Sequence, residues 1–108
     1  NTSYVYVWCA PSRGALMTGR LAMHNGYMCG GEPGAGCAVP LGFKLMPEHL
    51  KQRSYSTHHI GKWHLGMRLM AHLPISRGFD SSLGYLGGCE DYYTKVAEGG
   101  ACTVLSIS

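Results

Sequence analysis

The chain has 108 residues, of which 45% are hydrophobic and 14% charged, and it carries a formal net charge of +3. This length permits one ordinary domain at most. The apolar share excludes a disordered tail, no apolar run approaches the length of a membrane span, and the basic residues are too few and too scattered to indicate nucleic acid as a partner.

Five cysteines are many for a reduced protein of this size, so the composition favours an oxidising compartment. Five is also an odd number. One cysteine is therefore free, paired outside the chain, or chemically altered.

Residues 2–8 are β-branched and aromatic and predict extended chain, and the character of the sequence changes at Cys9. A short helix is expected over residues 11–20, because Pro11 fits a first turn and Gly19 supplies a stop. Gly14 weakens this helix from within.

Residues 24–42 are rich in glycine and predict a loop. A second helix is expected over residues 45–53, with Pro47 in its first turn, and residues 55–60 predict a strand. From residue 73 onward we expect short turns. The order of elements indicates an α/β layer with parallel strands, and no boundary divides residues 1–108.

The first chemical signal is Cys9 with Arg13. At the start of a helix, unpaired N–H groups and the helix dipole attract an anion, and Arg13 lies one turn along the same face. The pair is typical of a nucleophile with a cation beside it, although these two residues alone favour a packed thiol with a surface arginine. A thiolate phosphatase requires Cys, five residues, then Arg, and Ala15 stands at that position, which excludes it.

The second signal is the hexapeptide G-K-W-H-L-G at residues 61–66, directly after the predicted strand. Alternation along extended chain places Lys62 and His64 on one side and Trp63 on the other. Lys62 can hold an anionic oxygen, and His64 can hydrogen-bond the nucleophile or move a proton. The competing interpretation is a solvated lysine and a structural histidine beside a core tryptophan.

Both segments resemble the signatures of one family. The stretch C-A-P-S-R-G-A-L-M-T-G-R (residues 9–20) is similar to the first sulfatase signature, with Met17 in place of the usual Leu, and residues 61–66 are similar to the second. Further segments, among them L-P-I-S-R-G-F-D and G-Y-L-G-G-C-E-D-Y-Y, resemble the arylsulfatase B-like subfamily. The resemblance covers about residues 4–102.

The resemblance implies a sulfatase or alkaline-phosphatase-like α/β fold with a mixed, mainly parallel sheet, of which residues 1–108 are part of a single catalytic domain. It implies hydrolysis of sulfate esters, with N-acetylgalactosamine 4-sulfate in glycosaminoglycans or an aryl sulfate as candidate substrates. In this family a formylglycine-generating enzyme oxidises the signature cysteine, and Ca2+ polarises the sulfate. An altered Cys9 would leave an even number of cysteines.

Residue by residue, the resemblance assigns Cys9, as formylglycine, to the nucleophile and to the metal. Arg13 stabilises its hydroxyl, Lys62 binds sulfate, and His64 holds the hydrated aldehyde. The acidic pair and the later Asp–Asn pair that complete the Ca2+ site are expected outside the chain. We therefore expect the 108-residue chain alone to be inactive, and the parent protein to be lysosomal or extracellular through the secretory pathway.

Two departures from the family pattern carry expectations. The family partner of Cys37 is missing, since Ala71 or His72 stands in its place, so Cys29 becomes the simple candidate, and Cys89 and Cys102 are the remaining two cysteines. Three connectivities of these four stay open. Ser54 replaces a usual glycine, which costs on the order of 1 kcal/mol if the backbone is left-handed.

The same residues leave other functions open. A catalytically silent sulfatase-like chain that only binds sulfated glycans or a partner is the main alternative, and a phosphodiesterase on the same scaffold is disfavoured by the second signature. The histidines offer no zinc spacing. We expect Asp80 and the Glu90–Asp91 pair to form caps, turns or surface contacts rather than a site.

Overall fold

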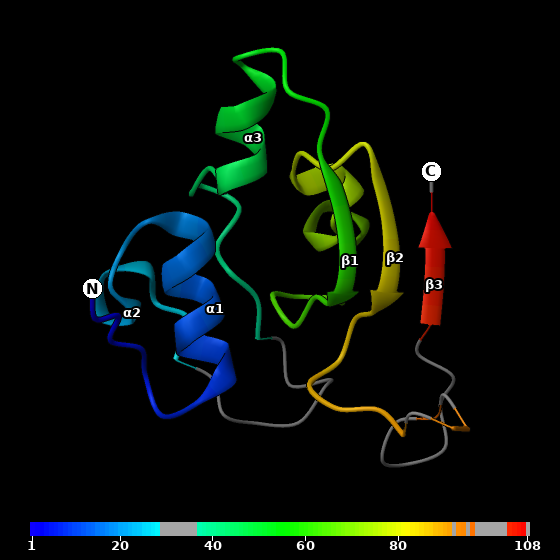
Figure 1. The fold of residues 1–108 in the computed structure, drawn as a ribbon, viewed down its shortest axis with the longest axis horizontal. Helices are drawn as coiled ribbons and strands as arrows, with labels where there is room; N and C mark the ends of the chain where they lie inside the picture. Colours follow the sequence, from blue (N-terminus) through cyan, green and yellow to red (C-terminus); the bar gives the residue numbers. More distant parts are fainter. Residues whose placement is uncertain (29–36, 92, 95, 97–103, 108) are drawn as a thin grey trace.

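The computed structural model describes residues 1–28, 37–91, 93–94, 96 and 104–107, the last four by their backbone alone. Strand β1 (His58–Lys62) pairs in parallel with β2 (Ser81–Tyr85), and β3 (Val104–Ile107) pairs antiparallel to β2. The helices α1 (Cys9–Thr18), α2 (Ala22–Asn25) and α3 (Met46–Lys51) lie on the β1 side of this sheet (Figure 1). The predicted α/β architecture with a mixed sheet is confirmed.

Helix α1 begins at Cys9, two residues earlier than predicted, and ends at Thr18. Pro11 occupies its first turn, as expected from the ring's fixed φ. Gly19 follows with φ 65°, and its N–H donates to the carbonyl of Ala15 at 2.9 Å, which satisfies one of the last helical carbonyls. The early start places Cys9 itself in the first turn.

Helix α3 is shorter than the predicted 45–53 segment, and Pro47 lies in its first turn as predicted. The carboxylate of Glu48 accepts the N–H of Leu45 at 2.7 Å and so caps the helix start. Three residues after the helix, Ser54 has φ 62°. The backbone at the departure from the family's glycine is therefore left-handed.

The strands differ most from the prediction. Residues 1–8 form no strand with any described residue, and Val5 and Val7 are 78% and 95% exposed. β-branched residues favour extended chain, but a strand also needs a partner. The strand predicted over residues 55–60 begins later, at His58, and β2 forms where only turns were expected.

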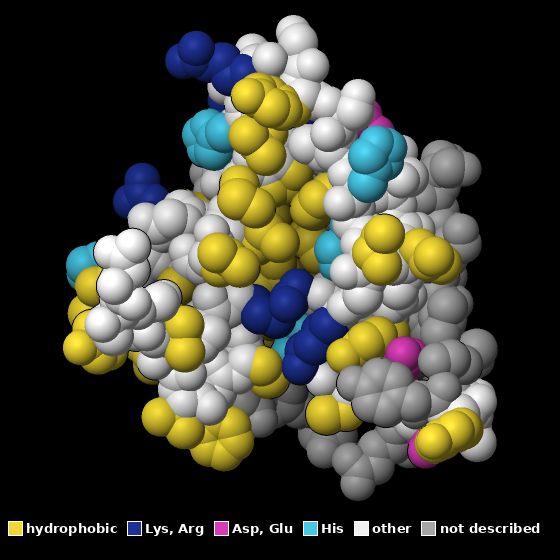
Figure 2. Space-filling view, viewed as in Figure 1, with side chains coloured by type: hydrophobic (Ala, Val, Ile, Leu, Met, Phe, Trp, Pro, Cys, Tyr) yellow, Lys and Arg dark blue, Asp and Glu magenta, His cyan; other side chains and the backbone are white. Residues whose placement is uncertain are grey.

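The core lies between the helices and the sheet, and hydrophobic side chains line this junction in Figure 2. It is built from Ala10, Met17, Tyr27, Val39, Leu45, Trp63, Leu65 and Phe79. Trp63 is fully buried, and its indole N–H donates to the carbonyls of Gly66 at 2.9 Å and His72 at 3.0 Å. Because Lys62 and His64 are the neighbours of Trp63 in the chain, the burial of Trp63 fixes the main chain from which these two candidate site residues project.

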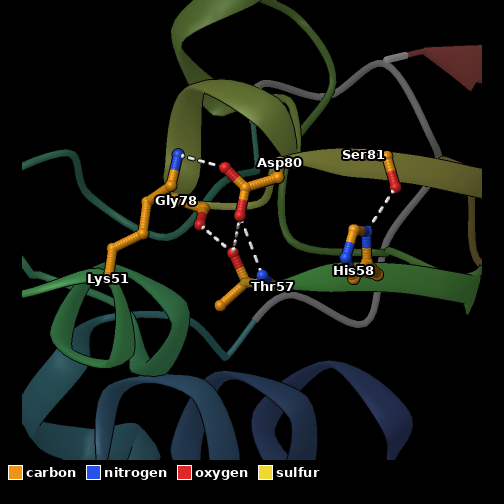
Figure 3. Close-up of polar contacts among 6 residues, drawn as sticks. All are labelled: Lys51, Thr57, His58, Gly78, Asp80 and Ser81. Atoms are coloured by element: carbon orange, nitrogen blue, oxygen red, sulfur yellow. Dashed lines mark hydrogen bonds and ion pairs between the residues drawn. The ribbon is translucent and has the colours of Figure 1, made fainter. Parts of the chain in front are cut away.

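Asp80 joins the start of β1 to helix α3 (Figure 3). Its carboxylate accepts the N–H of Thr57 at 2.8 Å and pairs with the ammonium of Lys51 at 2.8 Å. The Thr57 hydroxyl also donates to the carbonyl of Gly78 at 2.6 Å. Asp80 is therefore a structural carboxylate, as expected.

Two 3-10 turns, η1 (Met70–His72) and η2 (Ile75–Arg77), connect β1 to β2. The buried guanidinium of Arg77 donates to the carbonyl of Phe43 at 2.6 Å and lies 3.6 Å from the Glu48 carboxylate. These contacts fix the loop before α3. No helix among the described residues is long and apolar enough to cross a membrane.

Candidate active site

The two sequence signals meet in space at Cys9 and His64. The first turn of α1 and the carboxyl ends of β1 and β2 lie at the same end of the molecule (Figure 1). There the Cys9 sulfur lies 3.5 Å from Nδ1 of His64, across 55 residues of sequence. Cys9 is exposed and His64 is half-buried. The contact thus opens to solvent on the side of residue 9.

Arg13 connects α1 to the end of β1. Its Nε donates to the carbonyl of Trp63 at 2.8 Å, and its Nη2 donates to the carbonyl of Lys62. Burial lowers the pKa of Arg13, while the charges of Tyr85, Tyr27 and Cys9 act to raise it. The guanidinium stays charged at neutral pH, because arginine titrates far above that range. Arg13 therefore supplies a fixed cation next to Cys9.

The backbone of His64 departs from the extended geometry that alternation predicts. Strand β1 ends at Lys62, and His64, two residues later, has φ 51°, in the left-handed region. Its N–H donates to the carbonyl of Leu86 at 3.1 Å, and its carbonyl accepts the hydroxyl of Tyr27 at 2.5 Å. Trp63 still points into the core, as predicted, while His64 reaches Cys9 through this turn.

Lys62 is the last residue of β1 and is half-buried beside His64. Burial lowers the pKa of His64, and the charges of Lys62 and Arg13 lower it further. In Figure 2, basic side chains lie next to a histidine between the helices and the strands, and the acidic side chains visible on this face lie toward its right side. An anionic group would be attracted to this position.

Comparison with known proteins identifies the family. The sulfatase family model matches residues 2–106. This chain belongs to the sulfatase family. It is 40% identical to arylsulfatase J of Mus musculus over 92% of the chain and 17% of the relative. It is 38% identical to N-acetylgalactosamine-6-sulfatase of Homo sapiens over 70% of the chain and 16% of the relative.

Solved structures give the same result. The crystal structure of Ps i-CgsB superimposes with a TM-score of 0.74 and 40% identity, over 79% of this chain and 19% of that one. Its complex with k-i-k-neocarrahexaose superimposes with the same TM-score at 38% identity. The chain therefore spans less than a fifth of the length of the sulfatases that it matches.

Three further residues contribute to this candidate site without any indication of it in the sequence. Tyr27 binds the His64 carbonyl, Gly14 adjoins the Tyr27 ring, and Gly88 adjoins the imidazole of His64. A Cβ at Gly88 would lie 3.1 Å from Nε2 of His64, so the glycine permits the ring to sit where it does. Tyr27 and Gly88 follow no local pattern, since their role arises from contacts between distant segments.

The cysteine prediction needs a correction. Cys89 is an exposed free thiol, so the expectation that all four cysteines other than Cys9 form disulfides within the chain is wrong. Cys89 follows β2 on a solvent-facing loop, where no described cysteine reaches it. Cys37 does have a partner, and the predicted candidates Cys29 and Cys102 lie outside the described residues.

The residues around Cys9 do not form a calcium site by themselves. Among the described residues, no three His, Cys, Asp or Glu side chains gather in a metal-binding group. The charges near His64 and Cys9 belong to Arg13 and Lys62, and both are cationic. Calcium requires six to eight oxygen ligands, many of them carboxylates. A role of Cys9 as a metal ligand stays a prediction that needs carboxylates from elsewhere.

Proposed function

We propose that this chain carries the nucleophile of a sulfuric ester hydrolase of the arylsulfatase type, together with the two cations and the histidine that serve it. The observation that supports it best is the 3.5 Å contact between Cys9 and His64, which brings the two signatures into one site. Membership in the sulfatase family supports the same reaction class.

Residue 9 acts as formylglycine, made from Cys9 by a formylglycine-generating enzyme. Hydrated formylglycine supplies two hydroxyls. One attacks sulfur and displaces the alcohol of the ester, and the other then loses its proton as the bond to sulfate breaks and the aldehyde re-forms, a second step for which an unmodified thiol has no group. The exposed position of Cys9 in the first turn of α1 leaves room for this group.

His64 holds and deprotonates the attacking hydroxyl. Because burial and the charges of Lys62 and Arg13 lower its pKa, the imidazole is neutral at neutral pH and its Nδ1 can accept a proton. Nδ1 lies 3.5 Å from the Cys9 sulfur, which places the imidazole next to the group at position 9, and a general base closes such a contact further when the reacting complex forms.

Lys62 binds the sulfate group, and Arg13 stabilises the hydroxyl of residue 9. Arg13 lies on α1 and Lys62 ends β1, and the N–H groups and dipole at the start of α1 also favour an anion. Lys62 is the more adaptable of the two, since Arg13 is held by two carbonyls. Positive charge at the reacting group stabilises negative charge that develops as the ester bond breaks.

The substrate is a sulfated carbohydrate. The relatives include N-acetylgalactosamine-6-sulfatase, and a similar structure contains k-i-k-neocarrahexaose, which supports a saccharide over a simple aryl group. The cysteine content supports folding in the secretory pathway, with a lysosomal or extracellular destination. No step proposed here depends on Ca2+, whose carboxylate ligands would come from outside the described residues.

The test is a mass measurement on the peptide containing residue 9, joined to an activity assay. The natural protein that contains this sequence is purified from a host with formylglycine-generating activity, and it is assayed on an aryl sulfate and on sulfated N-acetylgalactosamine. An aldehyde at residue 9, turnover of a sulfate ester, and loss of both in Cys9→Ala are expected. An unmodified thiol with no turnover would favour the silent glycan-binding alternative.

A further inference from the structure

The main chain of His64 is held in a conformation that a histidine rarely adopts. Its φ of 51° lies in the left-handed region, which disfavours residues with a Cβ. Two hydrogen bonds fix it: the N–H donates to Leu86, and the carbonyl accepts the hydroxyl of Tyr27. The direction of the imidazole toward Cys9 depends on this backbone, and hence on these two bonds.

The side chain of Tyr27 packs tightly against helix α1. Its side chain is 2% exposed, and its ring packs so closely on Gly14 that a Cβ there would lie 2.9 Å from Cδ1. Its N–H donates to the side-chain oxygen of Asn25 at 2.8 Å, and the Asn25 amide donates to the Thr18 hydroxyl at 3.1 Å. Tyr27 therefore moves with the helix that carries Cys9.

The hydroxyl of Tyr27 acts only as a hydrogen-bond donor. Burial, followed by the charge of Cys9, raises the pKa of Tyr27 to about 12, although Arg13 acts to lower it. The phenol thus keeps its proton throughout the range in which enzymes work. A proton-transfer role for Tyr27 is disfavoured, and its contact with the reacting residue passes through His64.

We propose that Tyr27 is a positioning residue, which fixes the His64 imidazole against residue 9 by donating its hydroxyl to the His64 carbonyl. The proposal rests on the function proposed above for His64. Because Tyr27 contacts Gly14 and Asn25 on one side and the His64 carbonyl on the other, it holds the segment after β1 in a fixed position relative to α1. Side-chain hydrogen bonds of this kind hold a catalytic group within the narrow range of geometry that its reaction needs.

A double-mutant cycle tests this proposal in the natural protein that contains this sequence. Tyr27→Phe removes only the hydroxyl and is expected to lower kcat about tenfold or more, with KM little changed, since a displaced catalytic group slows the reaction by such factors. In a His64→Ala background the same change is expected to cause no further loss, because its effect passes through His64.

Tyr6→Phe is the matched control. Its hydroxyl also bonds the main chain, accepting the N–H of Ala22 at 3.1 Å, but it does not contact His64. We expect Y6F to keep the wild-type kcat. An undiminished kcat in Y27F, or an equal loss in the presence and absence of His64, would overturn the positioning role.

A structural measurement separates this proposal from the proposed function. Crystal structures of Y27F and Y6F are compared at His64, and we expect the imidazole to turn away from residue 9 in Y27F alone. If the natural protein hydrolyses no sulfate ester, the proposed function fails, and an unmoved imidazole in Y27F would refute the positioning of His64 by Tyr27. Should Y27F not fold, Gly14→Ala displaces the Tyr27 ring with its hydroxyl retained, and the same movement of His64 is expected.

Discussion

At the scale of single residues, Arg13 links the two signatures through the main chain. Its guanidinium donates to the carbonyls of Lys62 and Trp63, so it holds the end of β1 against α1 while it also places a cation beside Cys9. The sequence predicted only the second of these roles. One side chain therefore serves both the assembly of the site and its electrostatics.

Replacement of Arg13 by lysine is expected to weaken both roles. An ammonium keeps the charge but cannot donate to two carbonyls from one planar fork, and bonds from a charged donor contribute about 1.5–3 kcal/mol each. We expect Arg13→Lys to lower the free energy of unfolding by about 2 kcal/mol and kcat/KM by about tenfold, measured by denaturant unfolding and by turnover of a sulfate ester.

Arg68→Lys, at an exposed position, is the control and should change neither quantity. Equal behaviour of the two variants would contradict the role given to the Arg13 fork.

Ser54 offers a stabilising change. Its φ of 62° is unfavourable for any residue with a Cβ, and glycine removes that cost. Ser54→Gly is expected to raise the free energy of unfolding by about 1 kcal/mol, as measured by thermal and denaturant unfolding. Ser56→Gly, at an exposed position where φ is not positive, should instead be neutral or destabilising, and a gain from both would show that backbone conformation is not the cause.

At the scale of elements, Asp80 joins α3 to the start of β1 and β2. The Lys51 ammonium and the N–H of Thr57 hold the pKa of Asp80 at about 2, against an ordinary value of 3.8. A carboxyl whose pKa is lower in the folded protein stabilises the fold above its unfolded pKa, and this stabilisation is lost as pH falls through the folded value.

Asp80→Asn is therefore expected to lower stability at pH 7, with the difference from wild type shrinking as the pH falls from about 4 to about 2. Unfolding midpoints measured across this range check the prediction. Lys51→Met should show part of the same pH-dependent loss, since the ammonium is the first cause of the shift. A difference that stays constant with pH would contradict the linkage.

The sequence predicted correctly those features that depend on the conformational limits of a single residue. Pro47 in a first turn, Gly19 after the last turn of α1 and the left-handed backbone at Ser54 all follow from the residue's own conformational limits. Strand β2 could not be predicted in this way, because Ser81–Tyr85 has low β-propensity and forms a strand through pairing with β1. Residues 2–8 show the opposite case. They have high β-propensity, but they form no strand because no described strand pairs with them.

The candidate site residues could be predicted from two short segments of sequence. The contacts that position those residues could not. Cys9, Arg13, Lys62 and His64 were named from the sequence, and the structure brings them together. The bond from Tyr27 to His64 joins residues 37 positions apart, and no periodicity encodes it. The left-handed turn at His64 was likewise hidden, because only a few per cent of non-glycine residues adopt that conformation and alternation along a strand predicts extended chain there.

At the scale of the whole molecule, the chain spans less than a fifth of each sulfatase it matches. Its described residues place cations at residue 9 but no metal-binding group of acidic side chains. We therefore expect the isolated 108-residue chain to hydrolyse no aryl sulfate, with or without added Ca2+, even when residue 9 is an aldehyde. An assay of the purified chain beside a full-length sulfatase checks this, and turnover by the chain alone would refute it.

The Arg13 fork has a consequence for evolution and design. Because the guanidinium donates to peptide oxygens, its bond to residue 62 does not require a particular side chain at that position. Lys62 can therefore be replaced by a residue with a different functional group while the contact between α1 and the end of β1 is kept. The residue at position 62 can thus change the chemistry of the site while the Arg13 bonds continue to hold α1 against the end of β1.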